Sequence, residues 1–137
     1  MVASDESKSD SKSEDFSLND YSAIYLCGGH GCVEDFINNS SIKRIVENMY
    51  SIRKGCVGAI CHGPLGLVNC RNGDKLLLDG KFVAAFSNEE ESELGLRDLL
   101  PVLTEELMDQ QGAICVPAQP WSERCFVIYE YLILMYF

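Results

Sequence analysis

The feature that constrains this chain most is a short apolar run that leads directly into a Cys-His-Gly-Pro turn. Residues 56–60 are Cys-Val-Gly-Ala-Ile, which is typical of a buried strand. Cys61, His62, Gly63 and Pro64 follow without a spacer, and proline suits the first turn of a helix because its missing N–H is not needed there. Cys61 is therefore predicted to lie at a sharp strand-to-helix turn.

The rest of the chain alternates between apolar runs and amphipathic segments. A run at 22–27 ends at Gly28-Gly29 and predicts a second buried strand. Residues 41–52 carry one apolar stripe at helical spacing, and Ser40 or Ser41 can cap that helix. Further along, the pattern predicts a hairpin over 76–86 around Asp79-Gly80 and a helix in two pieces over 95–111, which Pro101 restarts and Gly112 ends. A short strand is predicted at 114–117.

This alternation of strands and helices is typical of an α/β fold with a mainly parallel sheet. Ligands bind to such sheets beyond the carboxyl ends of the strands. The loop at 28–31 and the pair Cys61-His62 both follow the end of a predicted strand. We therefore expect the two loops to share one crevice.

A cysteine at such a turn is suited to act as a nucleophile. The first N–H groups of the following helix favour negative charge, so we expect the pKa of Cys61 to lie below the ordinary value of about 8.5. The N–H of His62 and one from the Gly28-Gly29 loop can form an oxyanion hole. The imidazole of His62 can move protons near neutral pH if a carboxylate orients it. One of the acids in residues 88–93, which follow a predicted strand, is a candidate for that carboxylate.

Each of these assignments has a simpler alternative. Cys61 can be one of several buried cysteines, with His62 at the surface, but the surrounding strand, glycines and proline favour the functional interpretation. The acidic run at 88–93 is usually a solvated surface. A metal site is suggested by His30 between two cysteines, but the spacing matches no zinc pattern and a fourth ligand is missing. We therefore predict no metal, with Cys27 and Cys32 filling small spaces.

The charge and the cysteine content restrict the partners and the compartment. The net charge of −10 repels phosphate backbones and anionic membranes, so we expect neither nucleic acid nor a membrane as a partner. The seven cysteines include no Cys-x-x-Cys pair, and the first residues are not an apolar leader. Reduced thiols without a leader favour a cytoplasmic location.

Both ends of the chain differ in composition from its middle. Residues 1–20 are rich in Ser, Lys and acids, which predicts a disordered acidic arm. Residues 126–137 are almost wholly apolar but too short to cross a bilayer as a helix, which needs about 20 residues. As a strand, this tail is either central in the core or an aggregation hazard. A single folded domain is predicted between them, at 21–125.

Several motifs, in this order, resemble a known family. They are DYSAIYLCGGHG, GAICHGPLGLVN, LLLDGKFVAAFSNEEES, LGLRDLLPVLTEELMDQQGA and PAQPWSE. The chain resembles the ThiJ/PfpI superfamily, which shares the class I glutamine-amidotransferase-like fold, and within it the heat-shock, glyoxalase III-type branch. The resemblance implies a flavodoxin-like α/β sandwich of three layers. It also implies cofactor-free conversion of methylglyoxal, a small ketoaldehyde, to D-lactate, so no cofactor is expected.

The resemblance implies roles for individual residues. Three match a catalytic triad and three belong to a loop at the substrate: Cys61, His62 and Glu91, and Gly28, Gly29 and His30. Cys61 matches the nucleophile, and Gly29 matches the loop that supplies an oxyanion donor. The thiolate is expected to attack the aldehyde, a base then moves a proton between the carbons through an enediol, and hydrolysis releases the hydroxy acid.

The chain departs from this family at both ends. The family begins with a strand that carries a glutamate beside the cysteine, and it closes with a helix, and neither is recognisable here. We therefore expect a truncated or alternatively spliced product, or an imperfect gene model, with an incomplete sandwich. Such a chain is expected to be marginally stable or to rely on a partner chain, such as a second copy in a homodimer. The alternative functions are a non-catalytic chaperone or thiol stress sensor, or an inactive truncated product.

Overall fold

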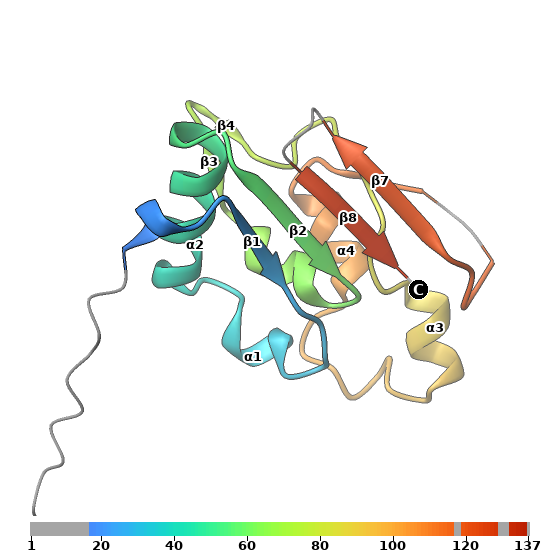
Figure 1. Ribbon diagram of the computed structural model, residues 1–137. Coiled ribbons are helices and arrows are strands. Elements are labelled where there is room, and N and C mark those ends of the chain that lie inside the picture. Colours follow the sequence, from blue (N-terminus) through green and yellow to red (C-terminus); the bar gives the residue numbers. More distant parts are fainter. Residues whose placement is uncertain (1–16, 117–118, 129–131, 137) are drawn as a thin grey trace, which may run out of the picture.

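The computed structural model describes residues 17–116, 119–128 and 132–136. A four-stranded sheet forms its centre. In Figure 1 the helix α4 (Thr104–Gln110) lies behind this sheet. The predicted arm at 1–20 and the apolar tail at 126–137 fall partly outside the described residues.

The four strands of the central sheet come from two distant parts of the chain, two strands from its first half and two from its last residues. Their order is β1 (Ala23–Leu26), β2 (Cys56–Ile60), β8 (Leu132–Tyr136) and β7 (Arg124–Ile128). The first three are parallel neighbours, and β7 runs antiparallel to β8 at the edge. This arrangement confirms the predicted α/β fold with a mainly parallel sheet. It places β8, part of the apolar tail, between two other strands.

The register of β1 and β2 sets the place of the site. Leu26 at the end of β1 pairs with Ala59, one residue before the end of β2. Because the two strands are parallel, the loops that follow them leave the same edge of the sheet. The loop at 28–31 and Cys61 therefore meet, as the sequence predicts.

The helix predicted at 41–52 is present in two parts. α2 (Ser40–Glu47) continues into a π-helical turn, η2 (Asn48–Ile52). The cap differs from the prediction: the side chain of Asn39, and not Ser40 or Ser41, accepts the first helical N–H groups, at 3.1 and 3.2 Å. Asn39 has the extended backbone of an N-cap, whereas Ser40 is already helical.

A short 3₁₀ helix, η3 (Gly63–Leu67), follows Cys61. All five of its residues are buried, and it contacts β1 and β2, α2, α1 (Cys32–Asp35) and α4 (Thr104–Gln110). Pro64 stands in its first turn, as predicted. This segment is short and apolar, so it packs the base of the site into the core and does not form a long surface helix.

The hairpin predicted around Asp79-Gly80 is wrong. The hairpin that forms is β3 (Arg71–Asn72) with β4 (Lys75–Leu76), and Gly73 turns it with a φ of +65°. β5 (Phe82–Val83) pairs with β6 (Ile114–Cys115) in parallel. The N–H of Gly80 donates to the carbonyl oxygen of Gly112 at 2.8 Å, so this turn joins distant segments and not the two arms of a hairpin.

The helices after β5 also differ from the prediction. The acidic run forms α3 (Asn88–Glu93), while 95–103 consists of turns, and α4 begins at Thr104 and not at Pro101. Gly112 follows α4 with a φ of +78°, which agrees with its predicted role at the helix end. The acidic run is not a wholly solvated surface, because Glu90 and Glu91 are buried.

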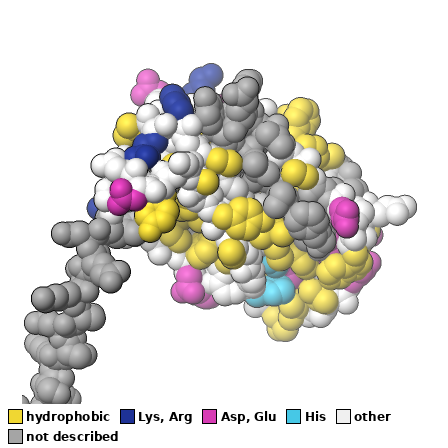
Figure 2. Space-filling model, viewed as in Figure 1, with side chains coloured by type: hydrophobic (Ala, Val, Ile, Leu, Met, Phe, Trp, Pro, Cys, Tyr) yellow, Lys and Arg dark blue, Asp and Glu magenta, His cyan; other side chains and the backbone are white. Residues whose placement is uncertain are grey.

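The surface of the described residues is uneven in character. Figure 2 shows hydrophobic side chains across the middle of one face and Lys and Arg side chains toward its upper left. Tyr25 is 46% exposed on β1. Within the described parts of the chain, no helix has the length and apolar character needed to cross a membrane.

Candidate active site

Cys61 occupies the turn between β2 and η3 with a left-handed backbone. Its φ is +59°, which residues with a β-carbon rarely adopt and which costs about 1–3 kcal/mol. The N–H of Phe86 donates to the carbonyl oxygen of Cys61 at 3.2 Å and ties the turn to the chain beyond β5. The structure thus contains the predicted sharp turn, and it holds the cysteine in a strained conformation.

Glycine allows the loop after β1 to lie against this turn. A β-carbon on Gly28 would stand 2.6 Å from the β-carbon of Cys61 and 2.8 Å from the carbonyl oxygen of Ile60. Both distances are too short for any side chain at that position. The first predicted loop residue is therefore in contact with the predicted nucleophile through its backbone.

Three of the predicted residues form a continuous chain of contacts. Sγ of Cys61 lies 3.2 Å from Nδ1 of His62, and Nε2 of His62 lies 2.7 Å from Oε1 of Glu91. Because an ionised carboxylate only accepts hydrogen bonds, Nε2 carries the imidazole proton and Nδ1 accepts from the thiol. His62 and Glu91 are fully buried.

Glu91 reaches His62 because the start of α3 is fixed in place. Ser87 and Glu90 form a capping box, in which the N–H of Ser87 donates to Oε2 of Glu90 at 2.9 Å. Oε1 of Glu90 accepts from the N–H of Trp121 at 2.8 Å. The carboxylate of Glu90 thus accepts hydrogen bonds from backbone N–H groups, and Glu91, the next residue, contacts the imidazole of His62.

His30 is the second imidazole of the site. Its Nε2 lies 3.2 Å from Oε2 of Glu91, so both carboxylate oxygens face a histidine. The rings of His30 and His62 are tilted against each other with centroids 4.3 Å apart. The family resemblance predicts that His30 lies in the substrate loop, but nothing in the local sequence pattern indicates its contact with Glu91.

Two aromatic rings that the sequence analysis did not single out line the imidazoles. The ring of Phe86 stacks on that of His62, with centroids 4.5 Å apart, and its edge faces His30 at 5.8 Å. Trp121 meets Phe86 at 5.9 Å in a T-shaped contact and is 50% exposed. These rings fix the orientation of both histidines.

The expectation of a lowered pKa for Cys61 is wrong. Burial raises the pKa of this thiol above its ordinary value, and the negative charges of Glu91 and Glu90 add to the rise. Burial also lowers the pKa of His62, although its hydrogen bond to Glu91 acts in the opposite direction. Both shifts favour the uncharged forms, a thiol and a neutral imidazole, at neutral pH.

Two backbone N–H groups act on this pKa in the opposite direction. Those of Gly29 and His62 lower the pKa of Cys61, each by less than burial raises it. They come from the two loops that were predicted to supply an oxyanion hole. Donors placed around the sulfur can stabilise negative charge that develops there or on an oxygen bonded to the same carbon.

One set of site residues also has the composition of a metal site. Ligand atoms of His30, His62 and Glu91 lie within 4.8 Å of one another. Here they form imidazole–carboxylate hydrogen bonds, in which each Nε2 carries a proton and offers no lone pair. Cys27 and Cys32, weighed with His30 from the sequence, are linked otherwise: Sγ of Cys32 donates to the carbonyl oxygen of Cys27 at 3.4 Å.

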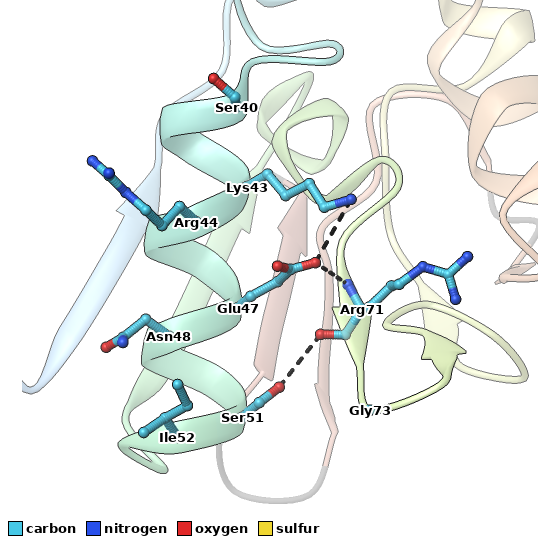
Figure 3. Close-up of a pocket in the computed structure, with 9 residues that line it drawn as sticks. All are labelled: Ser40, Lys43, Arg44, Glu47, Asn48, Ser51, Ile52, Arg71 and Gly73. Atoms are coloured by element: carbon cyan, nitrogen blue, oxygen red, sulfur yellow. Dashed lines mark hydrogen bonds and ion pairs between the residues drawn. The ribbon is translucent and has the colours of Figure 1, made fainter.

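A cavity of about 580 Å³ lies away from these residues, between α2 and the β3–β4 hairpin. Figure 3 shows Glu47 at its centre, where it accepts from the N–H of Arg71 at 2.7 Å and pairs with Lys43 at 3.8 Å. The guanidinium groups of Arg44 and Arg71 point away from each other. Because the cationic groups do not converge, this cavity is not a candidate site.

A sequence profile described as ThiJ/PfpI family-like matches residues 2–88, which include the loop at 28–31 and Cys61-His62. The chain belongs to the ThiJ/PfpI family. Two curated relatives are each 30% identical to it. Glyoxalase 3 of Candida albicans matches over 81% of this chain and 50% of its own length. The probable glutathione-independent glyoxalase HSP32 of Saccharomyces cerevisiae matches over 76% of this chain and 46% of its own length. The chain spans about half the length of the curated relatives it matches.

Solved structures of ThiJ/PfpI type match most of the chain. The 24 kDa rapid encystment protein of Francisella tularensis is 34% identical, with a TM-score of 0.82 over 89% of this chain and 54% of that one. Glyoxalase III of Candida albicans is 25% identical, with a TM-score of 0.78 over 88% of this chain and 52% of that one. These matches confirm the predicted flavodoxin-like fold and the resemblance to the glyoxalase III branch.

Proposed function

We propose that this ThiJ/PfpI chain converts methylglyoxal to D-lactate without glutathione, with Cys61 as the nucleophile. The observation that carries the proposal is the contact chain from the Cys61 sulfur through both nitrogens of His62 to Glu91. A thiol beside an oriented base suits addition to an aldehyde. Two relatives that are named as a glyoxalase and a probable glyoxalase support this choice of substrate.

Each residue of this contact chain has a defined role in the proposed reaction. His62 accepts the thiol proton as the sulfur attacks the aldehyde carbon, and then returns it to the new alkoxide. Glu91 orients the imidazole and stabilises its charged form. The N–H groups of Gly29 and His62 stabilise the oxyanion. Removal of the thiol proton by His62 takes the place of a resting thiolate, which the raised pKa of Cys61 disfavours.

The overall reaction needs no redox cofactor. Methylglyoxal and water become lactate, so the aldehyde carbon is oxidised while its ketone neighbour is reduced. The electrons move within one molecule through an enediol. The seven cysteines are all free thiols, which agrees with a reducing compartment such as the cytoplasm.

The raised pKa of Cys61 disfavours the second candidate function, a thiol stress sensor. A sensor cysteine is normally a thiolate at rest. Burial and two nearby carboxylates keep Cys61 protonated. The chaperone alternative has no specific contact in its favour.

The test is D-lactate formation from methylglyoxal by the purified chain. We expect Cys61→Ala to abolish production and Cys56→Ala to retain it, because Cys56 stands at the other end of the same strand. Lactate from Cys61→Ala, or none from a wild-type protein with a folded circular dichroism spectrum, contradicts the proposal.

A further inference from the structure

Glu91 holds two imidazoles and not one. Oε1 pairs with His62 and Oε2 with His30, at 2.7 and 3.2 Å. A fully buried carboxylate needs such partners, and two N–H donors satisfy one lone pair on each oxygen. The contact network therefore has four members, and His30 stands at its outer end.

The two histidines differ in their access to water. The side chain of His62 is 0% exposed and that of His30 is 39% exposed. His30 is still held in place, because its ring lies against those of His62 and Phe86 and its Nε2 is bound to Glu91. It is an ordered imidazole with a route to solvent, and Nδ1 remains as the ring nitrogen that can accept a proton.

The proposed reaction has two kinds of proton transfer, and His62 serves only one. His62 moves protons between sulfur and oxygen, since its Nδ1 faces the thiol. The hydrogen on the aldehyde carbon must also be removed and returned at the neighbouring carbon. The carboxylate of Glu91 is buried beneath the two imidazoles and is poorly placed to reach that carbon.

We propose that His30 is the second base of the site and moves the proton between the two carbons of the substrate. This inference rests on the proposed glyoxalase function. The loop that carries His30 already lies at the reacting centre, because a β-carbon on Gly28 would stand 2.6 Å from the β-carbon of Cys61.

The step balances with the residues present. In the hemithioacetal the first carbon carries hydrogen, hydroxyl and the Cys61 sulfur. His30 removes that hydrogen as a proton, and the electron pair forms the carbon–carbon double bond while the ketone oxygen takes the charge. His62 carries the hydroxyl proton from the first oxygen to the second. His30 then protonates the second carbon, which leaves a lactoyl thioester that water hydrolyses.

The decisive variant is His30→Gln, whose amide can still donate to Glu91. We expect kcat to fall by roughly 10²–10⁴-fold, the usual contribution of a general base. We also expect alkylation of Cys61 by iodoacetamide to keep its wild-type rate. The kinetic isotope effect with methylglyoxal deuterated at the aldehyde carbon should rise, because removal of that hydrogen becomes the slow step. Arg44→Gln, an exposed change on α2, serves as the control.

The outcomes separate this inference from the function on which it rests. Wild-type lactate production together with an unchanged kcat in His30→Gln overturns the role of His30 alone. A fall in kcat with an equal loss of Cys61 alkylation and an unchanged isotope effect also overturns it, because His30 then only positions Glu91. No lactate from the wild-type chain overturns both proposals.

Discussion

Gly63 stands so close to Leu26 that a β-carbon on the glycine would lie 2.1 Å from the leucine carbonyl oxygen. The turn that carries Cys61 is thus pressed against the end of β1, and the obstacle is backbone that cannot rotate away. The loop at 28–31 continues from that strand end. The same close packing therefore brings the loop and the nucleophile together.

Gly63→Ala tests this contact. We expect it to destabilise the fold by several kcal/mol or to prevent folding, because either β1 or η3 must shift. Gly31→Ala is the matched control, since the nearest atom to its added β-carbon is 4.0 Å away. Urea unfolding followed by circular dichroism compares the two, and equal stability of both variants contradicts the close packing.

Cys61→Gly is expected to be more stable than Cys61→Ala by about 1 kcal/mol. Glycine adopts a φ of +59° without strain, whereas alanine retains the strain of the cysteine. Both variants lack the thiol and should be inactive. Chemical denaturation of the pair measures the difference, and a less stable glycine variant shows that the turn stores no strain.

Glu91→Gln is expected to lower kcat by about 10²–10⁴-fold. The amide keeps the size of the carboxylate but offers only one acceptor oxygen, so one of the two imidazole N–H groups loses its partner. Nitrogen NMR of the two histidines reports that change. Glu89→Gln, an exposed change on α3, should keep wild-type activity, and an active Glu91→Gln contradicts the prediction.

Stability is expected to fall on both sides of neutral pH. Burial lowers the pKa of His62 below 6.5, so as the pH falls through 6.5 the unfolded chain binds a proton that the folded chain refuses. Burial raises the pKa of Cys61 above 9.0 and that of Cys70 and Cys115 to about 12. Above pH 9.0 the unfolded chain therefore releases protons that the folded chain keeps, and unfolding is favoured.

The measurement is the free energy of unfolding in urea at a series of pH values. Replacing His62 by Gln, which does not titrate, should flatten the acidic side of the profile. A wild-type protein whose stability is highest below pH 6 contradicts the burial of neutral His62.

Local patterns predicted the parts of the site that neighbouring residues determine. The run before Cys61 and the proline after it indicate the turn, and the apolar stripe at 41–52 indicates the helix. The partner of Cys61 could be predicted because it is the next residue, His62. The left-handed φ of Cys61 could not be predicted, because the strain comes from packing against other segments.

Long-range contacts account for most of what the sequence did not reveal. The contact of His30 with Glu91 and that of Trp121 with Phe86 join residues that are far apart in the chain. The sign of the Cys61 pKa shift was missed because burial depends on the whole fold. The hairpin was misplaced because Asp79-Gly80 has a turn sequence but pairs with the segment at Gly112.

The position of β8 makes Cys61 a chemical probe of the order of folding. β8 pairs with β2, the strand that leads into the nucleophile, although the two strands lie in opposite halves of the chain. Pairings of such high contact order form slowly. Until this one forms, β2 lacks a neighbour on one side, and the strand that leads into Cys61 is not held in place by the complete sheet. Pulse alkylation of Cys61 during refolding therefore dates the moment at which the centre of the sheet closes.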